Sequence, residues 1–337
     1  MRVEYLLCGI ALLFALHMTG KMVSRVTYAV GEAARDAAEA EANEPEYVTF
    51  IRGVVKHVVE DEGGTDEDAA DETPAADTGV DISQFADDGG YAGQVYALLY
   101  EYPDQVETIL SYYENAVLTV DGQQTTMGEQ SKDAIPERLL QLVVNNVETI
   151  DFVAAYPTKH DQDAKIDLSD EAKSDEVPLL LQWDQRWGYE EYGDGLLGYT
   201  GCGPTCLAMV ALYLTGDADI TPLAVANYAD EAGYYTDGVG SAWSLMSEGC
   251  EHFGLTGTEM YVSESDMVEM LEAGHPLICA VGAGDFTASG HFIVLYGYSD
   301  GAFLVNDPNS LIRSEQTWSY ETLSSQIKNI WYYSVVK

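Results

Sequence analysis

The chain has 337 residues and a formal net charge of −42, with 47% hydrophobic residues. This length suits two domains, or one domain with long extensions, and the apolar content supports a sizeable core. So negative a charge repels nucleic acid, and the sequence has no G-x-x-x-x-G-K-[ST] phosphate-binding loop. We therefore expect no nucleic acid, no nucleotide and no cofactor as a partner.

The N-terminal region, residues 1–30, contains one apolar run, YLLCGIALLFALHM at positions 5–18. Fourteen residues are few for a membrane span, which needs about 20. The run fits the hydrophobic part of a signal peptide or a tilted signal anchor. We expect an exported protein, extracellular or at the cell surface, and the choice between a cleaved signal and a membrane anchor stays open.

Residues 31–90 are acidic and low in complexity. The stretch from Glu60 to Asp88 holds twelve acidic residues and no Lys or Arg. Such a segment cannot bury enough apolar surface to offset the entropy of ordering it. We expect a disordered spacer here.

Residues 91–156 change character, because apolar residues recur there at helical spacing. The longest such segment begins after Pro136, where Leu139, Leu142 and Val143 fall on one face. We expect a small helical module with a structural or docking role. Residues 157–177 are polar and are interpreted as a linker, and residues 178–337 have the composition of a globular domain.

The strongest helix signal in the globular region begins at the sequence GCGPT. Pro204 suits a first helical turn, and Gly216 is a natural C-terminal stop. Cys202 therefore lies at a helix N-terminus, where free N–H groups and the helix dipole stabilise an anion and favour the nucleophilic thiolate. We expect Cys206, one turn further on, to be a buried core residue.

Two apolar runs further on, HFIVLYGY and AFLVND, are separated by Ser299-Asp300-Gly301 and predict a β-hairpin. His291 opens the first strand and Asp307 ends the second, so the hairpin brings the two side chains together. Asp307 can then hold one imidazole nitrogen while the other faces a thiol. From Trp187 through Ile312 the sequence has no Lys or Arg, so we expect this site to work without a basic side chain other than histidine.

These motifs, GCGPT followed by LAMV, then GHFIVL and VNDP, resemble the double-glycine-leader (bacteriocin-processing) peptidases. That group is cysteine peptidase family thirty-nine of the papain clan, and the likeness is greatest to its stand-alone, exported type. The resemblance covers about Val177–Lys337. It implies an α+β, papain-like fold, a helical part plus an antiparallel sheet, with Cys202 as nucleophile, His291 as base and Asp307 as the residue that orients the base.

The same resemblance implies a glutamine ahead of the cysteine that binds the developing oxyanion, a role suited to an amide N–H. Gln182 stands at the matching place, and Gln185 is the competing candidate. No nucleotide-binding domain accompanies the motifs, so leader cleavage coupled to transport is not implied.

The predicted function is hydrolysis of peptide or amide bonds through a thioester intermediate, on a peptide or protein substrate. The alternative is a catalytically inactive papain-like surface module that binds a cationic peptide or wall partner through its acidic face. A zinc site made by Cys202, Cys206 and His291 lacks a fourth ligand. The oligomeric state does not follow from the sequence.

Overall fold

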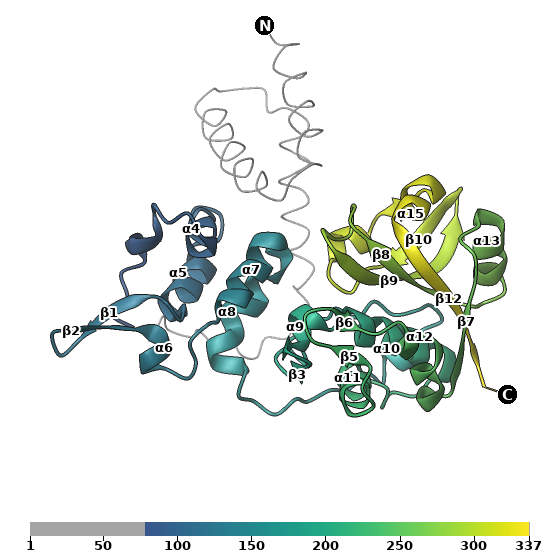
Figure 1. Cartoon of the computed structure of the whole chain (residues 1–337), viewed down its shortest axis with the longest axis horizontal. Helices are drawn as coiled ribbons and strands as arrows, with labels where there is room; N and C mark the ends of the chain where they lie inside the picture. Colours follow the sequence, from purple (N-terminus) through teal and green to yellow (C-terminus); the bar gives the residue numbers. More distant parts are fainter. Residues whose placement is uncertain (1–77, 337) are drawn as a thin grey trace, which may run out of the picture. The chain divides into compact units, whose positions relative to one another are not determined.

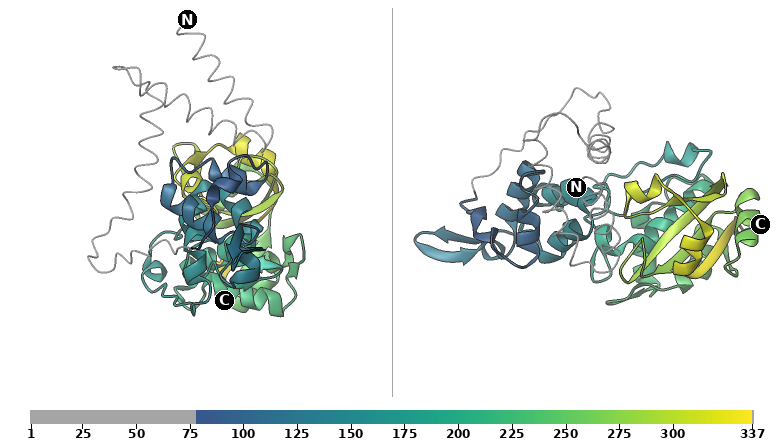
Figure 2. Two further views of the ribbon diagram at one scale, coloured as in Figure 1. Left: turned by 90° about the vertical axis from the view of Figure 1, so that its left-hand side faces the viewer. Right: turned by 90° about the horizontal axis from the view of Figure 1, so that it is seen from above.

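The computed structural model of the chain describes residues 78–336. The signal segment and most of the acidic spacer, residues 1–77, therefore lie outside the described residues. Contacts divide the chain into two compact units, Met1–Gln130 and Ser131–Lys337, which are taken separately below (Figures 1 and 2). Within residues 78–336, none of the helices combines the length and apolar character that spanning a bilayer requires.

The described part of the first unit is a small helical assembly with one hairpin. Its elements are η1 (Ile82–Phe85), α4 (Tyr91–Tyr96), α5 (Pro103–Tyr112), β1 (Val117–Val120), β2 (Gln123–Thr126) and α6 (Met127–Gln130). Its core is formed by the apolar faces of the helices, including the fully buried Val95, Val106 and Ile109. The last residues of the expected spacer thus contain a short 3-10 helix, and Phe85 within it is buried.

The second unit begins with helices and continues into a mixed α+β domain. Its helical elements are α7 (Glu137–Asn145), η2 (Val147–Thr149), α8 (Ile150–Lys159), η3 (Glu171–Lys173), α9 (Leu197–Thr200), α10 (Cys202–Thr215), α11 (Pro222–Glu231), α12 (Ser244–Ser247), η4 (Gly249–Phe253), α13 (Glu264–Glu272), α14 (Leu311–Ser314) and α15 (Tyr320–Gln326). Two short hairpins pair β3 (Glu191–Tyr192) with β4 (Gly195–Leu196), and β5 (Tyr235–Thr236) with β6 (Gly240–Ser241).

The main sheet has six strands in the order β11-β10-β9-β8-β12-β7, and every neighbouring pair is antiparallel. The strands are β7 (Leu255–Glu259), β8 (Leu277–Gly282), β9 (Gly290–Ser299), β10 (Ala302–Asn306), β11 (Thr317–Trp318) and β12 (Ile327–Val335). A helical part packed on an antiparallel sheet is the arrangement that the sequence predicted, so the α+β fold class is confirmed.

Each face of the sheet packs on its own hydrophobic core. Because side chains alternate along a strand, Ile278 and Ala280 of β8 join the core around α10, whereas Leu277, Cys279 and Val281 join the core on the opposite face. Helix α10 contacts β9 and β12, and α13 contacts β8 and β9. Figure 1 shows α10, α11 and α12 grouped beside the sheet, with α13 on its far side.

The helical segment after Pro136 differs from its prediction in two respects. It is broken at Asn146, which has an extended backbone and whose side chain accepts a hydrogen bond from the N–H of Glu148. Such a cap competes with continuation of the helix. Moreover, α7 and α8 fall in the unit Ser131–Lys337 and not with the preceding helices. The sequence could not predict this, because an apolar stripe indicates a helix but does not identify the core that buries it.

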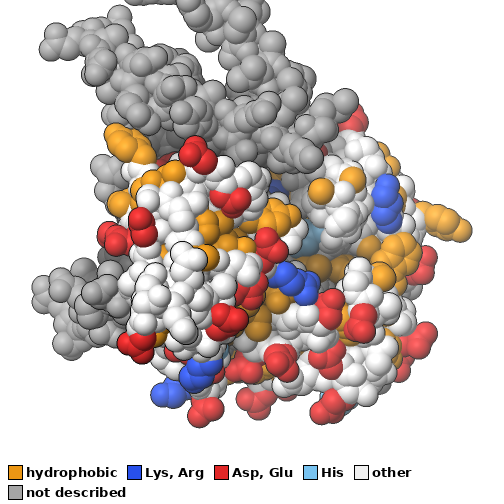
Figure 3. Space-filling view, turned by 60° about the vertical axis from the view of Figure 1, so that its left-hand side comes forward, with side chains coloured by type: hydrophobic (Ala, Val, Ile, Leu, Met, Phe, Trp, Pro, Cys, Tyr) orange, Lys and Arg blue, Asp and Glu red, His pale blue; other side chains and the backbone are white. Residues whose placement is uncertain are grey.

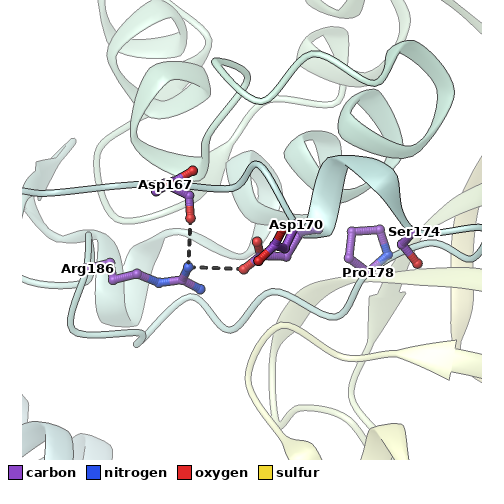
Figure 4. Close-up of a pocket in the computed structure, with 6 residues that line it drawn as sticks. Asp167, Asp170, Ser174, Pro178 and Arg186 are labelled. Atoms are coloured by element: carbon purple, nitrogen blue, oxygen red, sulfur yellow. Dashed lines mark hydrogen bonds and ion pairs between the residues drawn. The ribbon is translucent and has the colours of Figure 1, made fainter.

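The segment expected as a linker, residues 157–177, is attached to the second unit. Leu168 and Val177 are buried in the core around α10. Arg186 anchors the segment from the outside, because its guanidinium donates to the carbonyl of Asp167 and to the Glu171 carboxylate at 3.1 Å. Figure 4 shows this guanidinium facing a surface pocket that is also lined by Asp170, Ser174 and Pro178.

Candidate active site

Helix α10 places Cys202 at its first residue and ends at Gly216, whose φ of 68° is left-handed. The helix boundaries therefore confirm the prediction from GCGPT. Cys202 is half-buried, and the rest of the first two turns is buried. Gly203 is required by packing, because a Cβ at this position would lie 2.4 Å from the hydroxyl oxygen of Ser241.

Strands β9 and β10 form the predicted hairpin, which turns at Asp300 and Gly301. Both residues have positive φ, 54° and 82°, as a tight two-residue turn requires. His291 lies at the start of β9, and Asp307 follows the end of β10. His291 Nε2 and Asp307 Oδ1 are 2.7 Å apart, and the Asp307 side chain has no exposed surface.

The structure also brings the thiol of Cys202 close to the imidazole of His291, and each of these two groups shifts the pKa of the other. Since Nε2 of His291 faces Asp307, Nδ1 is the nitrogen left for the sulfur. The three side chains that the sequence singled out from two distant segments thus lie together, in the order sulfur, imidazole, carboxylate.

The electrostatic environment favours charge separation between the thiol and the imidazole. Burial opposes ionisation of Cys202, but the adjacent imidazole of His291 and its charge, with the N–H groups of Phe292 and Gly203, lower the pKa of Cys202 below its ordinary value. Burial likewise opposes the charge on His291, but Asp307 and Cys202 together raise the pKa of His291 to about 10. Both shifts favour the ionised pair, a thiolate beside an imidazolium, over the neutral pair.

Arg313 is a member of this cluster that the sequence did not reveal. Its Nε donates to Asp307 Oδ2 at 2.5 Å. Burial would raise the pKa of Asp307, but His291 and Arg313 lower it below its ordinary value. The expectation of a site without Lys or Arg is therefore wrong. Arg313 is the first basic residue after the stretch Trp187–Ile312, and α14 brings it onto Asp307.

The loop after Asp307 is held by its own hydrogen bonds. The hydroxyl of Ser314 accepts from the backbone N–H of Asp307 at 2.9 Å. The backbone N–H of Asn309 donates to Asp307 Oδ1 at 2.8 Å. Asp307 therefore receives donors from three directions, which fixes its carboxylate and keeps it ionised inside the protein.

The two candidate glutamines lie in different environments. Gln182 is buried, and its Nε2 donates to the carbonyl of Gly198 at 3.0 Å, four residues before Cys202. Its backbone N–H donates to the carbonyl of Pro308, next to Asp307. Gln185 is exposed. Gln182 is thus the glutamine tied to both parts of the cluster, and one N–H of its side-chain amide is not used by Gly198.

The remaining described cysteines lie in the interior. Cys206, Cys250 and Cys279 are free and buried, and burial raises the pKa of each thiol. Among residues 78–336, the ligand-type side chains close enough together to hold a metal are Asp133, His160 and Asp161. The zinc set considered from the sequence is not among them.

The fold and the cluster define a papain-like peptidase domain, in which a helix-start cysteine meets a histidine from strand β9 and an aspartate from the loop after β10. Residues 174–335 match the model of the Peptidase C39 like family. The resemblance predicted from the sequence is thereby confirmed for this part of the chain.

Two solved structures are similar to this domain. The peptidase domain of Streptococcus ComA, described as a bifunctional ABC transporter involved in a quorum-sensing pathway, is 17% identical with a TM-score of 0.35. The match covers 48% of this chain and 99% of that one. A putative C39-like peptidase from Bacillus anthracis is 18% identical with a TM-score of 0.30, and covers 51% and 99% of the two chains. No curated protein matches the sequence.

Proposed function

We propose that the domain hydrolyses peptide or amide bonds, with Cys202 as nucleophile, His291 as acid and base, and Asp307 as the residue that orients the imidazole. The observation that carries the proposal is the geometry of the cluster: a cysteine at the start of a helix lies beside a histidine whose imidazole is held at 2.7 Å by a buried carboxylate. In this arrangement the thiol ionises more readily than an ordinary cysteine, which activates it as a nucleophile.

The reaction has two halves in this scheme. The thiolate of Cys202 attacks the carbonyl carbon, and His291 gives its proton to the departing amine as the C–N bond breaks, which leaves a thioester on the sulfur. Water then gives a proton to His291 and attacks the thioester, and the acid product and the thiolate are released. An amide N–H of Gln182 is suited to stabilise the oxyanion in both halves.

The proposal is tested by a peptide-library cleavage assay on the full-length protein, with Cys202→Ala as the matched control. Cleavage that disappears in the control supports hydrolysis. A thiol-reactive peptide probe adds a second measurement, because labelling at Cys202 should vanish in His291→Ala. A wild-type protein that neither cleaves nor labels, and that binds cationic peptides in a salt-sensitive manner, would favour the inactive surface module instead.

We also propose that the domain acts outside the cytoplasm. The support is the apolar run at residues 5–18 with its signal-like length. Cell fractionation with an antibody to the peptidase domain tests this proposal, and recovery of the protein with the cytoplasmic fraction would contradict it.

A further inference from the structure

The loop that carries Asp307 and Arg313 is fastened to a segment that precedes the family-matching region. Glu148, in η2, lies beside the N-terminus of α14. Its Oε1 accepts from the Ser310 hydroxyl at 2.5 Å, and its Oε2 accepts from the backbone N–H groups of Leu311 at 2.7 Å and Ile312 at 3.2 Å. One carboxylate thus accepts hydrogen bonds from the hydroxyl and the backbone N–H groups at the start of α14, directly before Arg313.

Asn146 makes a second attachment to the same loop. Its Nδ2 donates to the carbonyl of Asn309 at 2.5 Å, while its Oδ1 accepts from the N–H of Glu148 and shapes η2. Ser310, which bonds to Glu148, also caps α14 by accepting from the N–H of Arg313 at 3.1 Å. The two η2 contacts therefore fix both the start of α14 and the turn between it and Asp307.

The other end of this segment contacts the cysteine side of the cluster. Arg138 of α7 donates to the carbonyl of Asp194 at 2.9 Å and lies 4.5 Å from the ring centroid of Tyr199 in α9, just before Cys202. A single stretch of chain, from α7 to η2, thus joins the part of the fold that carries Cys202 to the part that carries Asp307.

Glu148 is held at a cost to folding. Burial raises the pKa of Glu148 above its ordinary value, even though the bonds from Ser310, Ile312 and Leu311 and the charge of Arg313 lower it. Ionised Glu148 therefore subtracts from stability at neutral pH. A buried charge of this kind is weak evidence for a stabilising role, and the hydrogen bonds that it makes point to positioning as its role.

From these contacts we propose that Glu148 and Asn146 are positioning residues for the candidate active site. They hold α14 so that Arg313 meets Asp307. Asp307 in turn holds the imidazole of His291, and this imidazole lowers the pKa of Cys202. The inference rests on the proposed function. It makes the α7–η2 segment part of the working peptidase, although residues 174–335 alone match the family.

The test measures the rate of Cys202 alkylation by iodoacetamide across the pH range, with peptide mapping to separate the cysteines. Full-length wild-type protein is compared with Glu148→Ala, Glu148→Gln and Asn146→Ala, and with Glu272→Ala as a control at an exposed glutamate of α13. The thiolate is the reacting species, so the pH profile reports the pKa of Cys202.

We expect Glu148→Ala to raise the pKa of Cys202 and to slow alkylation at about pH 6 by roughly tenfold, the effect of about one pKa unit. Glu148→Gln keeps an acceptor for the α14 N–H groups and should recover most of the loss. Asn146→Ala should shift the profile in the same direction by less, and the control should match the wild type. Circular dichroism establishes that each variant is folded.

Folded Glu148→Ala and Asn146→Ala proteins with the wild-type pH profile would overturn the positioning role, provided that His291→Ala still changes the profile. If Glu148→Ala does not fold, Asn146→Ala decides alone by the same criterion. A wild-type thiol that titrates at its ordinary pKa, with no response to His291→Ala, would overturn the proposed function and the positioning role with it.

Discussion

Replacement of Arg313 by Gln tests the contact that the sequence did not reveal. Asp307 is fully buried and Arg313 Nε lies 2.5 Å from its Oδ2, so the change removes a charge-assisted hydrogen bond from a buried carboxylate. Such bonds contribute about 1.5–3 kcal/mol, and His291 remains as a partner, so we expect a loss of about 2 kcal/mol. For a unit of this size the melting temperature should fall by about 4–8 °C.

The sign of the pH dependence follows from the lowered pKa of Asp307. Its contribution to stability is present above the ordinary carboxyl pKa and is lost as the pH falls through the lower folded value. The difference in free energy of unfolding between Arg313→Gln and the wild type should therefore shrink in acid.

Urea denaturation at neutral and at acid pH measures the loss of stability and its pH dependence. The rate of Cys202 alkylation measures whether the change at Arg313 reaches the cysteine. Arg186→Gln is the matched control, because Arg186 also pairs with carboxylates but is partly exposed and bonds to Asp184 and Glu171, away from the cluster. The control should lose at most about 1 kcal/mol and keep the alkylation rate. An Arg313→Gln protein that resembles the control in both measurements would refute the reasoning.

Three further outcomes are expected. The rate of peptide hydrolysis should rise with pH through the lowered pKa of Cys202 and fall as His291 loses its proton near pH 10. A rate that does not fall at alkaline pH would contradict the pairing of a Cys202 thiolate with a protonated His291. Cys206→Ala should keep most activity, whereas Cys202→Ala should remove it with no change in circular dichroism. Loss of turnover in Cys206→Ala would instead identify Cys206 as the nucleophile. Gln182→Ala should lower kcat by roughly a hundredfold or more with little change in KM, and an unchanged kcat would remove Gln182 from the oxyanion site.

The core of the site could be predicted because its signals are local. A glycine-flanked cysteine before an apolar helix, and a hairpin with His at one end and Asp at the other, each follow from a few neighbouring residues. Their meeting in space came from the family resemblance, and the structure places Cys202 beside His291, which is hydrogen-bonded to Asp307.

Arg313 and Glu148 could not be predicted in the same way. Arg313 reaches Asp307 only because α14 turns back, and Glu148 reaches α14 from 162 residues upstream of Ser310. One available signal was the isolation of Arg313 as the first basic residue after a long stretch with none. The grouping of α7 and α8 with the preceding helices failed to anticipate the division after Gln130, since periodicity does not identify a packing partner.

The strand order has a consequence for biogenesis. The fully buried strand β8 lies between β9 and β12, yet β12 comes last of the six in the chain and alone links β7 to the sheet. While the polypeptide emerges from the ribosome, β8 therefore presents a bare, apolar edge until Ile327–Val335 has been made. An unpaired edge of this kind invites association between chains, so we expect β8 to be protected from such association only once β12 has paired with it.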